Sequence, residues 1–196
     1  MTTWRALQVL PRSGHARMPW KNGRGVTEQI AVEPAGAPLD AFAWRVSTAV
    51  VSEGGPFSAF PGCARILVVI EGDGLALNGA PVPPLAPHRF SGDDATTATL
   101  AGGPIRDFNL IAREGVGASC DVVRVRGEVT LPAADDALVY CVQNALDCEG
   151  HHLAAGDALR ARDGAPLRVT GDGVLLHVRV ALGAQDQRRA ESPADS

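Results

Sequence analysis

The stretch GPFSAFPGCARILVVIEGDG, from Gly55 to Gly74, decides the fold of this chain. Its centre is a run of branched aliphatic residues that lies between two glycine-containing turns, which is the pattern of a buried β-strand. Because side chains alternate between the two faces of a strand, Arg65, Leu67 and Val69 share one face. The other face carries Ile66, Val68 and Ile70. Since both faces are apolar apart from Arg65, we expect this strand to lie between two packed layers.

Short strand-like segments recur along the chain and are separated by clusters of Gly, Pro, Asp and Asn. They cover residues 3–10, 26–32, 42–50, 65–71, 95–100, 106–113, 121–126, 137–143, 157–162 and 174–180. One helical turn is expected near Ala133–Ala137. Many short strands punctuated by turns favour a β-sandwich or β-barrel over an α/β fold.

The opening stretch also resembles the metal-binding motif of cupins. In that motif a glycine is followed by His-x-His, then by a Glu, and then by an apolar strand that ends in a glycine turn. Here Ser58 and Phe60 stand where the histidines would be, and Arg65 stands where the Glu would be. A hydroxyl, a phenyl ring and a guanidinium cannot hold a divalent first-row metal. The resemblance therefore implies a cupin-like barrel that holds neither a metal nor another cofactor.

Five motifs occur in the order seen in the HutD/Ves family. They are PWKNGRGVT (19–27), FAWRVSTA (42–49), GPFSAFPG (55–62), FSGDD (90–94) and GGPIRDFNL (102–110). The chain resembles this family of small bacterial bicupins, one branch of which is associated with histidine-utilisation operons. The resemblance covers about the first 115 residues strongly and the rest loosely. It implies an all-β bicupin.

A faint internal repetition predicts how the chain is divided. RILVVIEGDGLALNG (65–79) is echoed by ALVYCVQNALDCEG (137–150). We expect two cupin-like β units, residues 1–115 and 116–182, packed into one rigid body. The tail 183–196 is polar and alanine-rich without apolar periodicity, and is expected to be disordered.

The resemblance places Ser58, Phe60 and Arg65 inside the first barrel. A buried guanidinium needs an acceptor, because an unpaired buried charge is very costly. Asp107 is the candidate within the protein, and it shares a strand face with Asn109. Two readings stay open: a structural salt bridge between Arg65 and Asp107, or a site where a ligand supplies the acceptor.

Two further segments carry candidate binding residues. On the strand 42–50, Arg45 and Ser47 alternate with apolar neighbours and suit a small carboxylate, which arginine binds bidentately. A solvated outer face is the alternative, and the resemblance favours the site. The glycine-rich loop PWKNGRGVT would bring Lys21, Asn22 and Thr27 over the mouth of a pocket, where they could contact an anionic ligand.

Charge and composition narrow the partners. The chain has 196 residues and a formal net charge of −4, so nothing attracts nucleic acid or anionic lipid. No run of about 18 apolar residues occurs, and we expect a cytoplasmic protein without a membrane partner. The four cysteines form no CxxC pair, which suits buried thiols in a reducing compartment. The oligomeric state stays open, a homodimer included.

The histidines suggest no catalytic set: His151 and His152 are adjacent and would point to opposite faces, while His177 is expected to be a hydrogen-bonded strand residue. We therefore expect a metal-independent cupin that binds a small anionic metabolite. By resemblance this would be a histidine-degradation intermediate, formiminoglutamate or formylglutamate, with a sensing or regulatory role. The alternatives are a metal-free hydrolase or isomerase with Asp107 as base and Arg65 as electrostatic stabiliser, or a stress-associated interaction protein with a vestigial pocket.

Overall fold

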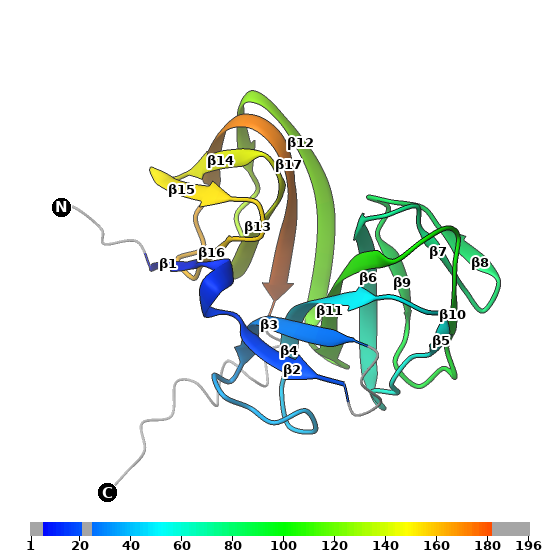
Figure 1. The fold of residues 1–196 in the computed structure, drawn as a ribbon. Coiled ribbons are helices and arrows are strands. Elements are labelled where there is room, and N and C mark those ends of the chain that lie inside the picture. Colours follow the sequence, from blue (N-terminus) through cyan, green and yellow to red (C-terminus); the bar gives the residue numbers. More distant parts are fainter. Residues whose placement is uncertain (1–5, 21–24, 182–196) are drawn as a thin grey trace, which may run out of the picture.

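The computed structural model describes residues 6–20 and 25–181, which are built almost wholly of β-strands (Figure 1). The strands in this part of the chain are β1 (Leu7–Leu10), β2 (Ala16–Pro19), β3 (Val26–Glu33), β4 (Trp44–Val51), β5 (Gly55–Pro56), β6 (Cys63–Glu71), β7 (Leu75–Leu77), β8 (Ala80–Val82), β9 (His88–Ser91), β10 (Thr97–Leu100), β11 (Ile105–Arg113), β12 (Gly117–Leu131), β13 (Asp136–Gln143), β14 (Ala145–Cys148), β15 (His151–Ala154), β16 (Ala158–Ala161) and β17 (Leu167–Ala181). A single 3-10 turn, η1 (Arg12–Gly14), is the helical structure described. The all-β prediction is confirmed.

Each expected strand segment contains an observed strand, but β12 and β17 are much longer than their apolar cores indicated. The helical turn expected at 133–137 is wrong. Residues 132–135 are irregular and β13 begins at Asp136, because that residue already pairs with Val180 of β17. Seven short strands went unpredicted, since two to four residues carry too little periodicity to stand out. They are β2, β5, β7, β8, β9, β14 and β15.

The first unit consists of two sheets that face each other. Its six-stranded sheet has the order β2-β3-β4-β11-β6-β9, and its four-stranded sheet has the order β5-β10-β7-β8 (Figure 1). Part of the space between them is filled by an apolar cluster that includes Leu67 and Val69 of β6. The rest of that space is a cavity, described below.

The second unit is one larger sheet of order β1-β16-β13-β17-β14-β15, with β12 paired to β17. The β12 and β17 strands pair without interruption from Gly117↔Ala181 to Leu131↔Leu167. Strand β1 comes from the start of the chain yet pairs with β16, so the N-terminal segment crosses to the sheet of the second unit. The interior of this sheet is a cluster of buried apolar side chains that includes Val139, Leu159 and Leu175.

An apolar layer joins the two units. Ile66, Val68 and Ile70 of β6 belong to one buried cluster together with Leu138 and Tyr140 of β13 and Leu176 and Val178 of β17. The rings of Phe108 and Tyr140 meet in this layer with centroids 5.2 Å apart. The other face of β6 points into the first unit. The prediction that β6 lies between two packed layers is therefore confirmed, and the two units form one body.

A buried ion cluster reinforces the joint. Arg160 of β16 donates to Asp136 of β13 at 2.8 and 2.5 Å and to Glu33 of β3 at 2.7 Å. Its guanidinium also lies 4.5 Å from the ring centroid of Trp44 on β4. Because β3 and β4 belong to the first unit, this arginine ties the two sheets together across 127 residues of sequence. No sequence pattern indicated the contact.

All four cysteines are buried and free, as expected for reduced thiols. In the described part of the chain, no helix has the length and apolar character needed to cross a membrane. The tail 183–196, which the sequence predicts to be disordered, lies outside the described residues.

Candidate functional site

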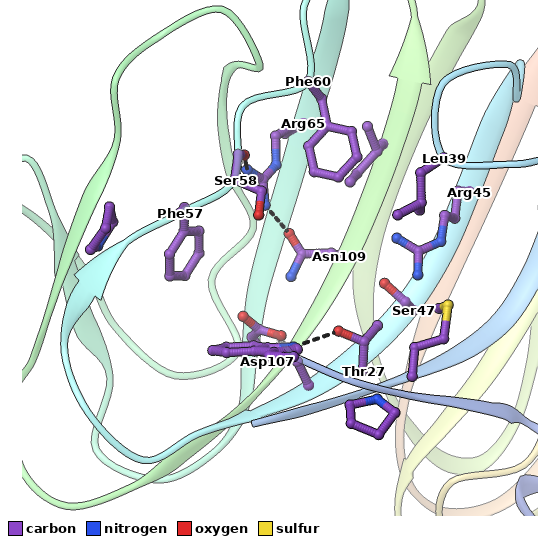
Figure 2. Close-up of a pocket in the computed structure, with 16 residues that line it drawn as sticks. Thr27, Leu39, Arg45, Ser47, Phe57, Ser58, Phe60, Arg65, Asp107 and Asn109 are labelled. Carbon is purple, nitrogen blue, oxygen red and sulfur yellow. Dashed lines mark hydrogen bonds between the residues drawn. The ribbon is translucent and has the colours of Figure 1, made fainter. Parts of the chain in front are cut away.

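A cavity of about 580 Å³ opens on the inner face of the six-stranded sheet of the first unit (Figure 2). Eight of the predicted site residues line it: Thr27, Arg45, Ser47, Ser58, Phe60, Arg65, Asp107 and Asn109. The other two, Lys21 and Asn22, lie outside the described residues. The eight side chains that were predicted from the sequence therefore line one cavity in the folded chain.

Strand register explains the arrangement. β11 runs through the middle of the site, and its Asp107, Asn109 and Ile111 all face the cavity. Ile111 lies opposite Arg45 of β4 on one side and opposite Arg65 of β6 on the other. Both guanidinium-bearing residues are therefore anchored at the level of Ile111 in the sheet, and Asp107 lies four residues from that level along β11. The predicted alternation on β4, β6 and β11 is confirmed.

Arg65 is held from several sides. Its Nη1 donates to the Ser58 carbonyl at 2.9 Å, and its Nη2 donates to Asn109 Oδ1 at 3.0 Å. Its guanidinium carbon lies 5.5, 5.3 and 4.8 Å from the ring centroids of Phe57, Phe60 and Phe90. Burial lowers its pKa to about 10, against the opposing effect of the Asp107 charge. The predicted apolar surroundings of Arg65 are confirmed, and the faces of three aromatic rings interact favourably with its positive charge.

Of the two alternatives for Arg65, the structural salt bridge to Asp107 is absent from the described residues. No nitrogen of Arg65 lies within 4.0 Å of an Asp107 oxygen, and Arg65 instead uses the uncharged acceptors of Ser58 and Asn109. Figure 2 shows the Asn109 amide between the two charged groups. The physical reason is register: Asp107 is paired with Val69 of β6, whereas Ile111 is paired with Arg65.

Asp107 is consequently a buried carboxylate without an ion-pair partner among the described residues. Only 2% of its surface is exposed, and its Oδ1 atom has no hydrogen-bond donor in this part of the chain. Burial raises its pKa to about 7, although the Arg65 charge, the Asn109 side chain and the Ala49 backbone all lower it. Such a group can change protonation state near neutral pH.

Arg45 provides the second positive charge. It is 5% exposed, its Nε donates to Gln29 Oε1 at 2.8 Å, and burial lowers its pKa. Its two terminal nitrogens form no hydrogen bond or ion pair with any described residue. Figure 2 shows the guanidinium directed toward Ser47 at the cavity. A buried guanidinium with unused donors is suited to a bidentate carboxylate.

The mouth of the cavity is shaped by residues that the sequence analysis did not select. Trp20 follows β2, and its indole nitrogen donates to Thr27 Oγ1 at 2.9 Å. Gly25 allows this packing, because a Cβ there would lie 2.9 Å from the Trp20 ring and from the Val50 carbonyl oxygen. Trp20 and Phe57 stand inside the quoted motifs, so motif membership was a signal that could have identified them.

The donor set does not fit a metal. At the cupin ligand positions, Ser58, Phe60 and Arg65 offer no imidazole, carboxylate or thiolate. Asp107 is the one acid among the described residues that line the cavity. Three or more metal-ligating side chains do not gather anywhere in residues 6–20 and 25–181. A first-row metal needs several such donors around it.

No histidine is among the described residues that line the cavity. His151 and His152 are exposed on β15. His177 of β17 is buried, but its Nε2 atom has no hydrogen-bond partner in the described structure, so the prediction of a hydrogen-bonded strand histidine is wrong for this atom. Burial and the Arg179 charge lower its pKa to about 4. The apolar interior of the second unit offers this ring nitrogen no donor.

Comparison with known proteins identifies the relatives of the chain. A model of the HutD family matches residues 12–178. A Pseudomonas putida protein described as an uncharacterized 21.2 kDa protein in the hutC 3′ region is 48% identical over 110 residues. That match spans 54% of this chain and 57% of the relative, so only about half of the relative's length is covered. The structure of HutD from Pseudomonas fluorescens SBW25 is 34% identical, with a TM-score of 0.76 over 90% of this chain and 100% of that one.

A more distant structure bears on the fold alone. The bacterial pirin YhhW from Escherichia coli, solved in complex with nickel(II), has a TM-score of 0.61 at 11% identity, over 91% of this chain and 100% of that one. This cupin-type neighbour confirms the bicupin architecture predicted from the sequence.

Proposed function

The chain belongs to the HutD family, and on that premise we propose that the cavity of its first unit binds a small anionic metabolite without a metal. The observation that carries the proposal is Arg45, a buried guanidinium whose terminal nitrogens have no acceptor among the described residues. Arg65 adds a second positive charge to the same cavity. A carboxylate would supply the acceptor that Arg45 lacks, and a dicarboxylate could neutralise both arginines.

Family context supports the identity of the ligand. The HutD family is linked to histidine utilisation, and the P. putida relative is described by its position beside hutC. We propose formiminoglutamate or formylglutamate, since each carries two carboxylates and a small nitrogen substituent. The cavity volume of about 580 Å³ lies within the usual range for small-molecule sites. The role would be to sense an intermediate of the pathway and regulate histidine utilisation.

One observation favours a catalytic alternative. Asp107 has a pKa raised to about 7 by burial, and such a carboxylate suits a general base. A metal-free hydrolase or isomerase would use Asp107 as base and Arg65 as electrostatic stabiliser. Against this, no histidine, cysteine or lysine is among the described residues that line the cavity. The hydroxyls of Thr27, Ser47 and Ser58 also line it, but none of them is hydrogen-bonded to Asp107 in the described structure, so we favour binding.

Calorimetric titration of both metabolites, with turnover assayed in parallel, tests the proposal. We expect saturable binding without turnover, and roughly a 10- to 150-fold loss of affinity for Arg45→Met, because a charge-assisted hydrogen bond contributes about 1.5–3 kcal/mol. Arg168→Met is the matched control, since that arginine is exposed on the second unit and pairs with Glu128. Full affinity in folded Arg45→Met would overturn the site. Turnover would instead establish a metal-free enzyme. The absence of both binding and turnover would favour the interpretation of a vestigial pocket.

A further inference from the structure

Asp107 is a group that the proposed binding of carboxylates does not use. Anionic ligands are attracted by Arg45 and Arg65 and repelled by an ionised aspartate. Yet Asp107 borders the cavity, is almost fully buried, and leaves its Oδ1 atom without a donor in the described chain. A buried polar atom without a partner destabilises the folded state, so its position calls for an explanation.

The surroundings show which charges act on this carboxylate. Arg65 faces it from β6 and Arg45 faces the cavity from β4, whereas the residues of β5 and of the segment that follows it line the cavity with uncharged groups. Arg106 lies on the other face of β11, where it pairs with Glu28 at 3.2 Å and with Glu71 at 3.3 Å. Among the described residues, the lining therefore holds two guanidinium groups and one carboxylate, with Asn109 between Arg65 and Asp107 (Figure 2).

This arrangement complements a ligand with two negative groups and one cationic N–H group. Building on the proposed function, we propose that Asp107 is a specificity-determining residue that selects dicarboxylates bearing a cationic nitrogen over neutral N-acyl analogues. The amidinium of formiminoglutamate is such a cation, and the formamide of formylglutamate is not. The two carboxylates then oppose Arg45 and Arg65, and the amidinium donates to Asp107. Because the terminal torsion of aspartate is broad, either oxygen can turn toward the cavity.

Electrostatic balance favours the same ligand. With Asp107 ionised, formiminoglutamate balances the charges of the described lining, since two carboxylates and one amidinium meet two guanidinium groups and one carboxylate. Formylglutamate would leave one negative charge in excess unless Asp107 takes up a proton. Burying an uncompensated charge is costly. We therefore expect formylglutamate, whose N-acyl group is uncharged, to bind with Asp107 protonated.

The pKa of Asp107, raised by burial to about 7, makes this difference measurable in solution. A bound amidinium stabilises the ionised form, so it lowers the pKa and releases a proton near neutral pH. A bound formylglutamate neutralises the arginines without adding a cation, so it raises the pKa and takes up a proton. The two ligands are thus expected to shift protons in opposite directions.

The experiment measures affinity for formiminoglutamate and formylglutamate by calorimetry in wild type, Asp107→Asn and the control variant Glu128→Gln. Asp107→Asn keeps the side-chain size and removes the charge. We expect the ratio of the two affinities to fall roughly ten- to a hundredfold in this variant, chiefly through weaker formiminoglutamate binding. Glu128→Gln makes the same acid-to-amide change at an exposed position of the second unit, where the carboxylate pairs with Arg168, and should leave the ratio within about twofold.

Repeating the wild-type titrations near pH 7 in buffers of different ionisation enthalpy gives a second readout that needs no variant. Proton release with formiminoglutamate and uptake with formylglutamate would support the inference. An unchanged affinity ratio in folded Asp107→Asn, or the same proton shift for both ligands, would overturn it. In either case the proposed function stands if both ligands bind and Arg45→Met weakens both. If neither binds the wild type, the proposed function itself fails.

Discussion

The inner faces of the two units differ although both are built from antiparallel strands. In the first unit the central strands β4, β6 and β11 direct Arg45, Arg65, Asp107 and Asn109 toward a cavity. In the second unit the corresponding interior, formed by β13, β16 and β17, holds aliphatic side chains that include Val139, Leu159 and Leu175. Inward-facing positions thus decide whether a β unit of this fold forms a binding cavity or a packed core.

The difference assigns distinct roles to the two halves. A fully buried aliphatic side chain stabilises the fold by about 1.5–3 kcal/mol, so the interior of the second unit contributes stability. The first unit gives up part of that packing and keeps charged groups out of water, which costs free energy that a ligand of matching charge can recover. The buried Arg160 cluster and the apolar layer around β6 let the second unit support the first.

The largest effect is expected from opening the packed interior. Leu175→Ala removes a fully buried side chain of the second unit and should lower the free energy of unfolding by about 2–5 kcal/mol in urea titrations. Ser47→Ala, at the cavity of the first unit, should change it by less than about 1 kcal/mol. Equal losses in the two variants would show that the two interiors contribute alike, and the comparison would fail.

A smaller effect is expected from pH acting on the first unit. The pKa of Asp107 is about 7 in the folded chain and 3.8 when unperturbed, so the folded state binds the proton more tightly. Its contribution to stability is therefore complete below about pH 4 and is lost as pH rises toward 7, by up to about 4 kcal/mol. Asp107→Asn should remove this dependence in unfolding free energies measured across that range. Identical pH profiles for the two proteins would show that Asp107 is ionised throughout.

The smallest effect is expected from the second unit, with the opposite sign. The pKa of His177 is lowered from 6.5 to about 4, so the unfolded state binds the proton more tightly. Stability is complete above about pH 6.5 and is lost as pH falls toward 4, by up to about 3 kcal/mol. His177→Leu keeps an apolar side chain at this buried position and should flatten the acid limb of the profile in thermal melts. If this variant loses stability in acid as steeply as wild type does, another group is responsible.

Many of the side chains that line the candidate site could be predicted from the sequence, because the alternation of side chains along a strand is a local property. The pairing of Arg45 with Ser47 on β4 and of Asp107 with Asn109 on β11 follows from a spacing of two residues, and each pair lines the cavity. The hydrogen-bond partners of Arg65 could not be predicted from the sequence. Its acceptor on Asn109 lies 44 residues away, and a one-step change of register would have replaced that acceptor.

Local sequence patterns predicted ten of the seventeen described strands, their alternation, the two packed layers around β6 and the side chains that could face a cavity. The fold as a whole sets which charged groups find hydrogen-bond partners. Arg65 donates to Ser58 and Asn109, and Arg160 donates to Asp136 and Glu33. The terminal nitrogens of Arg45 and the Oδ1 atom of Asp107 have no partner among the described residues. The fold also places β1 in the second sheet. The difference arises from the separation along the chain of the residues involved. Alternation is set by the backbone of each strand, whereas a hydrogen bond between side chains depends on the register of strands that are distant in the chain.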